Sequence, residues 1–149
     1  MKPSTALPAL LIMASLFGCS RSSNHSMNLP LAATHNNPGQ IASTTLTSVG
    51  NQTNFDFDIT GVPTGTLLPP RLYTFIHKGS CQQPGAVAFA MNDKVNTKST
   101  AGTNGWTFYR SAPIAMKDLL AGTYSIVVRT APEDGNSDIF CGDIAQATR

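Results

Sequence analysis

The sequence predicts an all-β fold for residues 41–149, an antiparallel β-sandwich or flattened barrel with a disordered N-terminal tether. Roughly seven or eight short runs of alternating or β-branched residues follow residue 40, separated by turns rich in glycine, proline and asparagine. No stretch has the 3.6-residue apolar period of a long amphipathic helix. Short strands spaced in this way are typical of sandwiches and barrels, and the length suits one hydrophobic core.

The first residues have the pattern of a targeting segment. Lys2 is positively charged, and residues 7–17 are almost wholly apolar. That run is shorter than the about 20 residues needed to cross a bilayer, but it suits the apolar core of a signal peptide. It ends in Leu-Phe-Gly-Cys, which resembles a lipobox, so we expect a signal peptide over residues 1–18 and lipidation of Cys19. The alternative is an ordinary signal peptide that is cut elsewhere.

Ser20, directly after this cysteine, resembles the residue that sorts lipoproteins to the outer membrane in Gram-negative bacteria. We therefore expect the N-terminal lipid to hold the protein in the outer membrane, facing the periplasm or the cell surface. Residues 19–40 are rich in Ser, Asn and Pro without a sustained period, which predicts a lipidated flexible linker. His25 and His35 lie there without ligand-spaced partners, and we interpret both as solvated.

The content of charged residues bears on which classes of partner the protein can bind. The 149-residue chain carries 10 Lys and Arg against 8 Asp and Glu, and 12% of its residues are charged. The usual charged fraction is about 25%, so the polar surface must come mainly from Asn, Ser and Thr. No basic cluster is present, and we therefore expect no nucleic-acid partner.

The strand pattern is clearest in residues 54–60, NFDFDIT, where alternation separates two groups of side chains. Phe55, Phe57 and Ile59 share one face, and Asp56 and Asp58 share the other. This predicts a half-buried antiparallel strand with one solvated side. The other strands are expected over residues 41–49, 71–77, 86–91, 106–110, 123–130 and 139–145. Residues 116–120 fit either a short strand or a helical turn.

Cysteine usage agrees with an exported protein. If Cys19 carries lipid, Cys81 and Cys141 remain as an even pair, in an oxidising compartment where disulfides persist. A bond between them would close a loop of about 60 residues and contribute roughly 4 kcal/mol to stability in the chain-entropy model.

Three segments together resemble a known family. YTFIHKGSC at 73–81 resembles the F-H-V-H…G…C segment of copper/zinc superoxide dismutases and the H-I-H-x-G segment of CHRD-type domains. LLAGTYSIVVRT at 119–130 resembles a later strand of that family, and FCGDIAQA at 140–147 resembles its closing strand. The matches run in the family's order. The resemblance implies a Greek-key, superoxide dismutase-like sandwich and a disulfide between Cys81 and Cys141.

The same comparison implies that the family's metal site is lost. Copper there needs an H-x-H pair, whose residues i and i+2 share a face, but here Phe75 precedes His77. Arg129, a permanent cation, matches the position of another imidazole, and the loop after Cys81 contains no histidine. Asp138 matches the family's substrate-guiding arginine. His77 alone remains as a candidate metal ligand, whereas specific sites use three or four.

We therefore expect no catalytic residue, no metal and no cofactor. If the resemblance places the strands correctly, His77 and Arg129 project toward the same region, where they form a polar or anion pocket or contact a neighbouring Asp.

Two other signals have ordinary interpretations. Residues 134–138 offer D-x-N-x-D, but Ile139 occupies the glycine position of a calcium loop, which favours a polar turn. Trp106, Phe108 and Tyr109 fit an aromatic binding surface or, as we prefer, core residues plus one exposed ring. No G-x-S-x-G elbow is present.

These observations lead to three hypotheses. The first is a non-enzymatic lipoprotein that carries a metal-free binding or surface module. The second is a degenerate copper-binding or superoxide-defence protein that uses His77 with Met91, Met116 or the free amino terminus of a delipidated form. The third is a surface antigen or an interaction protein whose partner is an envelope or host protein.

Overall fold

The computed structural model describes residues 25–145, and this part of the chain is almost entirely β-structure. The strands are β1 Ser26–Ala33, β2 Ala42–Val49, β3 Gln52–Ile59, β4 Leu72–Gly79, β5 Pro84–Ala90, β6 Lys98–Ser99, β7 Trp106–Ala112, β8 Tyr124–Thr130 and β9 Asp138–Ile144. A short helix α1, Met116–Ala121, precedes β8, and a 3-10 turn, Pro132–Asp134, precedes β9. The expected signal peptide and Cys19 lie outside the described residues. No helix in residues 25–145 is long and apolar enough to cross a membrane.

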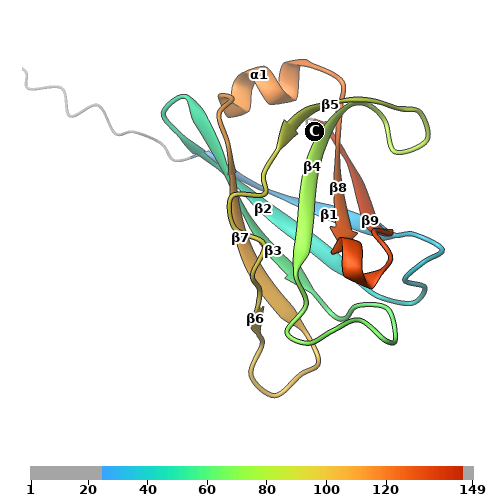
Figure 1. Cartoon of the computed structure of the whole chain (residues 1–149). Helices are drawn as coiled ribbons and strands as arrows, with labels where there is room; N and C mark the ends of the chain where they lie inside the picture. The colour runs from blue at the N-terminus through green and yellow to red at the C-terminus, as the bar shows by residue number, and fades with distance from the viewer. Residues whose placement is uncertain (1–24, 146–149) are drawn as a thin grey trace, which may run out of the picture.

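All strand pairs are antiparallel, and the described strands form one curled sheet in the order β5-β4-β8-β9-β1-β2-β3-β7-β6. Figure 1 shows this sheet as a half-barrel with α1 across one end. The chain crosses between the two halves of the sheet from β3 to β4, from β5 to β6 and from β7 to β8. The predicted all-β antiparallel fold is confirmed, with a single sheet that curls instead of two separate sheets.

Strand β1 corrects the expected flexible linker over residues 19–40. Residues 26–31 of β1 pair with β2 and residues 32–33 pair with β9, so this strand joins the two halves of the sheet. Leu29 and Leu31 are buried, whereas Asn28 and Pro30, which alternate with them, are exposed. Pro30 is tolerated because pairing with β9 begins only at Ala32, so its missing N–H costs no ladder bond on that side.

The predicted strand over residues 54–60 is confirmed as β3. Its three apolar side chains are buried, and Asp56 and Asp58 are exposed. Phe57 stacks on Phe108 of β7, with ring centroids 4.6 Å apart and planes at 7°. Residues 116–120 take the helical alternative, as α1, whose Met116 and Leu119 close the end of the core. The two-residue strand β6 was not predicted.

The open side of the half-barrel is closed by the segment after β5 and by Arg110. The amide of Leu72 donates to the carbonyl of Val95 at 2.9 Å, and Thr97 Oγ1 donates to the carbonyl of Pro70 at 2.8 Å. Arg110 of β7 is only 4% exposed, and its Nη2 donates to the carbonyl of Leu72 at 2.9 Å. A buried guanidinium therefore links β7 to β4 across the opening.

The predicted disulfide between Cys81 and Cys141 is confirmed, with Cα atoms 5.9 Å apart. It joins the loop after β4 to the middle of β9. Gly79 has a left-handed φ of 87°, and a Cβ at this position would collide with the carbonyl of Gln83. The tight turn that only glycine allows here directs Cys81 back toward the sheet.

Candidate functional site

His77 and Arg129 line one shallow pocket on the outer face of the sheet. In the register of β4 and β8, Tyr73 pairs with Arg129 and His77 pairs with Ser125. The alternating residues Leu72, Thr74 and Ile76 of β4 are buried on the other face. The pocket measures about 260 Å³ and is also lined by Asp138 and both disulfide cysteines. The structure thus brings together the two residues that the sequence singled out.

The His77 ring is held at one nitrogen and free at the other. Its Nδ1 lies 3.0 Å from the carbonyl oxygen of Gly85, which can only accept, so Nδ1 carries the proton and donates. The ring packs edge-on against Phe75, with centroids 6.2 Å apart. Nε2 is buried and has no hydrogen-bond partner in the described part of the chain. In the neutral imidazole with this tautomer, Nε2 is the nitrogen that carries the lone pair.

Arg129 is occupied by Asp138 and by an aromatic ring. Its Nε donates to Oδ1 of Asp138 at 2.6 Å, and its guanidinium carbon lies 4.9 Å from the centroid of Phe75. A register shift after Val128 sets Arg129 directly opposite Asp138 on β9. Of the two roles expected for this region, the structure contains the contact with a neighbouring Asp. An anion would have to compete with a carboxylate that is already in place.

The loop after Cys81 covers this face of β8. Val127 is buried on the side opposite the main core, and it shares the pocket with Cys81 of the loop and with Pro84 and Gly85 at the start of β5. The amide of Cys81 donates to Oδ1 of Asp143 at 2.7 Å, which adds a second link to β9 beside the disulfide. The disulfide, this hydrogen bond, the buried Val127 and the Arg129–Asp138 salt bridge together hold the loop against β8 and β9.

The side chains around His77 do not provide enough ligands to hold a copper ion tightly. Within residues 25–145, no three His, Cys, Asp or Glu side chains gather around one point. Met91 and Met116, the thioethers that the copper hypothesis would use, belong to the main hydrophobic core, whereas His77 lies on the opposite face of β4. The cysteines are bonded to each other. One imidazole and no soft partner remain at this position.

The other signals in the sequence have structural roles. Asp134 Oδ1 accepts from the amide of Leu67 at 2.9 Å, and Asp138 pairs with Arg129, so these two carboxylates of the calcium-like segment are engaged in turn and sheet contacts. Phe108 is in the core, Trp106 is half-buried, and Tyr109 is 50% exposed on the other face of β7. His25 and His35 are both exposed, as expected.

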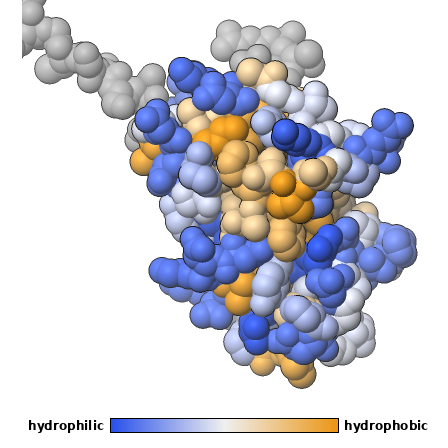
Figure 2. All heavy atoms as spheres, turned by 45° about the horizontal axis from the view of Figure 1, so that its top comes forward, coloured by the Kyte–Doolittle hydropathy of each residue, from blue (hydrophilic) through white to orange (hydrophobic). Residues whose placement is uncertain are grey.

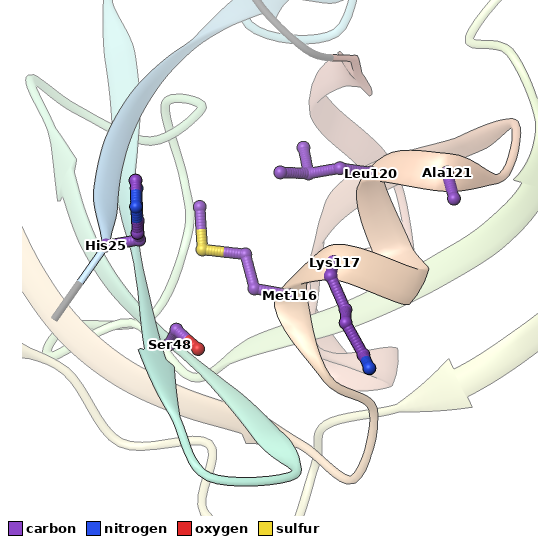
Figure 3. A pocket seen from close by; sticks show the side chains of 6 residues that line it. All are labelled: His25, Ser48, Met116, Lys117, Leu120 and Ala121. Atoms are coloured by element: carbon purple, nitrogen blue, oxygen red, sulfur yellow. The ribbon is translucent and has the colours of Figure 1, made fainter. Parts of the chain in front are cut away.

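A second pocket lies between α1 and the beginning of β1, and it was not anticipated from the sequence. Figure 3 shows His25, Ser48 and Met116 facing a space bordered by Lys117 and Leu120. The volume of this pocket is about 350 Å³. This places the N-terminal entry of the described chain beside α1. Figure 2 shows apolar residues gathered on the face that includes this end, surrounded by hydrophilic ones.

Comparison with known proteins adds no family: no protein-family model matches the chain, and no curated protein matches it.

Proposed function

We propose that this protein is a non-enzymatic lipoprotein of the bacterial envelope, in which a superoxide dismutase-like β-scaffold without its metal site serves as a binding or surface module. One observation carries the proposal. At the position where the resemblance would require several imidazoles, His77 stands alone, and the cation beside it, Arg129, is paired with Asp138. Such a pocket offers neither the ligand set of a redox ion nor an unpaired cation for superoxide, and we infer that the region supports the fold.

Localisation follows from the lipobox-like segment before Cys19, and the anchor would be a lipid attached to that residue. The disulfide between Cys81 and Cys141 supports an oxidising compartment, where such bonds persist. Labelling of cells with a radioactive fatty acid tests the anchor. Label on the wild type and none on Cys19→Ala is the expected result.

A superoxide-consumption assay tests the absence of enzyme activity. The full chain, incubated with copper and zinc and then freed of excess metal, is expected to consume superoxide no faster than bovine albumin treated in the same way. A metal-dependent rate that disappears in His77→Ala would overturn the proposal.

One observation favours the copper hypothesis as a second candidate: Nε2 of His77 is buried without a partner in the described residues. A nitrogen fixed through the Nδ1–H bond to a carbonyl has the arrangement of many metal-binding histidines. One imidazole alone gives weak binding, so this candidate requires further donors that residues 25–145 do not bring to the pocket.

A protein partner is the third candidate, and the edge strand β5 favours it. Its seven residues, PGAVAFA, carry no charge, and Val87 is 50% exposed. β5 is the last strand on its side of the described sheet, so its outer backbone groups are free to pair with an added strand. Cross-linking in intact cells would test for such a partner, with Val87→Lys expected to reduce the cross-linked product.

A further inference from the structure

We propose that the pocket at the end of the half-barrel remote from α1 binds a neutral carbohydrate; this inference names a ligand for the binding module proposed above. The pocket measures about 560 Å³ and is formed by Gln40, the loop between β3 and β4, and the hairpin between β6 and β7. In Figure 1 the β6–β7 hairpin lies at the opposite end of the sheet from α1.

The chemistry of the walls points to an uncharged polar ligand. They consist of threonine, serine, asparagine and glutamine side chains, glycine backbone, a few aliphatic side chains and one tryptophan, without any Asp, Glu, Lys, Arg or His. A charged ligand would lose its hydration here without gaining a counter-ion. The groove on the outer face of β3 and β7 differs in this respect, because Asp56, Asp58, Lys94 and Lys98 line it.

Trp106 supplies the flat apolar surface that a sugar ring needs. Its side chain packs partly against the core, so its orientation is fixed, yet one side of it lines the pocket. The indole N–H makes no hydrogen bond to any of the residues described, which leaves it available to a ligand hydroxyl. A sugar ring has an apolar C–H face and a hydroxyl rim, and the amphipathic indole matches both.

The walls are fixed before any ligand arrives. Asn37, which is buried, donates from Nδ2 to the carbonyl of Gly61 at 3.1 Å. The hydroxyl of Thr60 donates to Oε1 of Gln40 at 2.7 Å, which leaves the NH2 group of that amide for a ligand. A Cβ on Gly61 would lie 2.7 Å from Gln40 Oε1, so a side chain at this position would displace the amide. A preformed wall reduces the entropy lost on binding.

The opposite wall of the pocket carries exposed side chains that can form hydrogen bonds with a ligand. Ser99 and Asn104 line the pocket from the β6–β7 hairpin, and their side chains are exposed and make no hydrogen bond to the described residues. The hydroxyl of Thr103 accepts from the amide of Gly105 at 3.0 Å and so shapes the hairpin. Planar amides and hydroxyls on both sides of an indole can reach the hydroxyls of one bound ring.

The position of the pocket suits an anchored protein. The described chain enters at the α1 end, where His25 and Met116 line the same cavity. A lipid on Cys19 would therefore attach at that end, and the carbohydrate pocket would face away from the membrane.

The test uses the single tryptophan of the chain as its reporter. The full chain is titrated with neutral trisaccharides of glucose, of galactose and of N-acetylglucosamine, and Trp106 fluorescence is recorded. We expect saturable quenching or a shift by at least one of them, with a dissociation constant of about 0.1–5 mM. A hyaluronan oligosaccharide, which carries carboxylates, is expected to bind at least fivefold more weakly. Failure of all three neutral sugars to give a saturable change overturns the inference.

Variants connect the signal to the pocket. Asn104→Ala, at an exposed side chain, is expected to weaken binding at least fivefold without changing the unfolding midpoint. Tyr109→Ala removes an exposed ring from the other face of β7 and serves as the matched control, with unchanged affinity. Equal affinity of wild type and Asn104→Ala, or loss in Tyr109→Ala alone, would place the sugar elsewhere and refute this site. A negative titration would leave the non-enzymatic assignment intact, because that assignment depends on the superoxide assay.

Discussion

Arg110 is the residue whose environment departs most from what its side chain normally requires. Its guanidinium is buried among carbonyls and lies 4.8 Å from the centroid of Phe108, and burial lowers the pKa of Arg110 to about 10. This pKa lies below the ordinary value for arginine but well above 7, so the group remains protonated at neutral pH. Its Nη1 and Nη2 donate to the carbonyls of Tyr109 and Leu72 at 2.7 and 2.9 Å. No carboxylate bonds to it among the described residues.

Truncation of the Arg110 side chain should destabilise the fold, because it opens a cavity and removes the donors to two carbonyls. We expect Arg110→Ala to lower the free energy of unfolding by about 3 kcal/mol. Arg110→Met refills the volume and removes the buried charge, so it should stay within about 1.5 kcal/mol of the wild type. Urea unfolding measures both, and equal losses in the two variants would contradict the account.

The same residue predicts a pH dependence. Because the folded pKa of Arg110 lies below that of the unfolded chain, the unfolded state binds more protons above about pH 10, and this group's contribution to stability rises with pH there. The wild type should therefore gain stability relative to Arg110→Met between pH 8 and pH 10.5. Urea unfolding at both pH values tests the sign, and a relative loss would show that Arg110 is not desolvated.

The ion pair with Asp138 prevents Arg129 from binding an anion. Replacement of Asp138 by alanine should therefore create an anion site at Arg129. The pair is partly exposed, with side-chain exposures of 26% and 45%, so Asp138→Ala should cost no more than about 1 kcal/mol. The freed guanidinium should then bind sulfate. We expect 50 mM sodium sulfate to raise the unfolding midpoint of this variant more than that of the wild type, at matched ionic strength. An identical salt response would mean that Asp138 does not control the pocket.

Among the elements, β3 and β1 show what sequence reasoning can and cannot reach. β3 was predictable because phenylalanine and isoleucine alternate strictly with aspartate. β1 was missed because only two leucines mark its buried face and Ser, Asn and Pro surround them. Its strand state comes from pairing with β2, the next strand along the chain, and with β9, which lies near the other end of the described residues. The bridge from Arg110 to Leu72 was missed for the same reason, because no local pattern reports a contact across the barrel opening.

The central position of β1 makes a direct prediction about truncation. A chain that begins at His25 keeps all nine described strands and should unfold cooperatively with the stability of the full chain. A chain that begins at His35 lacks β1, which exposes the edges of β2 and β9 and removes Leu29 and Leu31 from the core. It should lack the near-ultraviolet circular dichroism of a folded protein. A cooperative unfolding transition in the shorter chain would contradict this prediction and would mean that the β1 segment is a flexible linker.

At the scale of the whole molecule, the disulfide links positions 60 residues apart in the sequence. In the chain-entropy model a loop of this length restricts the unfolded state by roughly 4 kcal/mol, less any cost in the folded state. We expect the Cys81→Ala, Cys141→Ala double variant to lose about 2–4 kcal/mol in urea unfolding. A loss below about 0.5 kcal/mol would mean that the curled sheet and its small lid over β8 are stable without the cross-link.

The resemblance to the dismutases led us to expect the bonded cysteines and the proximity of His77 to Arg129, because those features lie on strands that short local motifs mark in the sequence. The partner of each side chain was harder to predict. The pairing of Arg129 with Asp138 depends on a register shift in β8 and β9 that no single segment reveals. The neutral pocket around Trp106 depends on three loops that meet only in the folded molecule.

The central claim is that the strand ending in His77 supports the fold and does not hold a redox metal. Equilibrium dialysis of the full chain against 1 μM copper, followed by metal analysis of the protein, tests it most directly. The account predicts far less than one copper per chain, with no difference between the wild type and His77→Ala. One tightly held copper per chain that is lost in His77→Ala would contradict it.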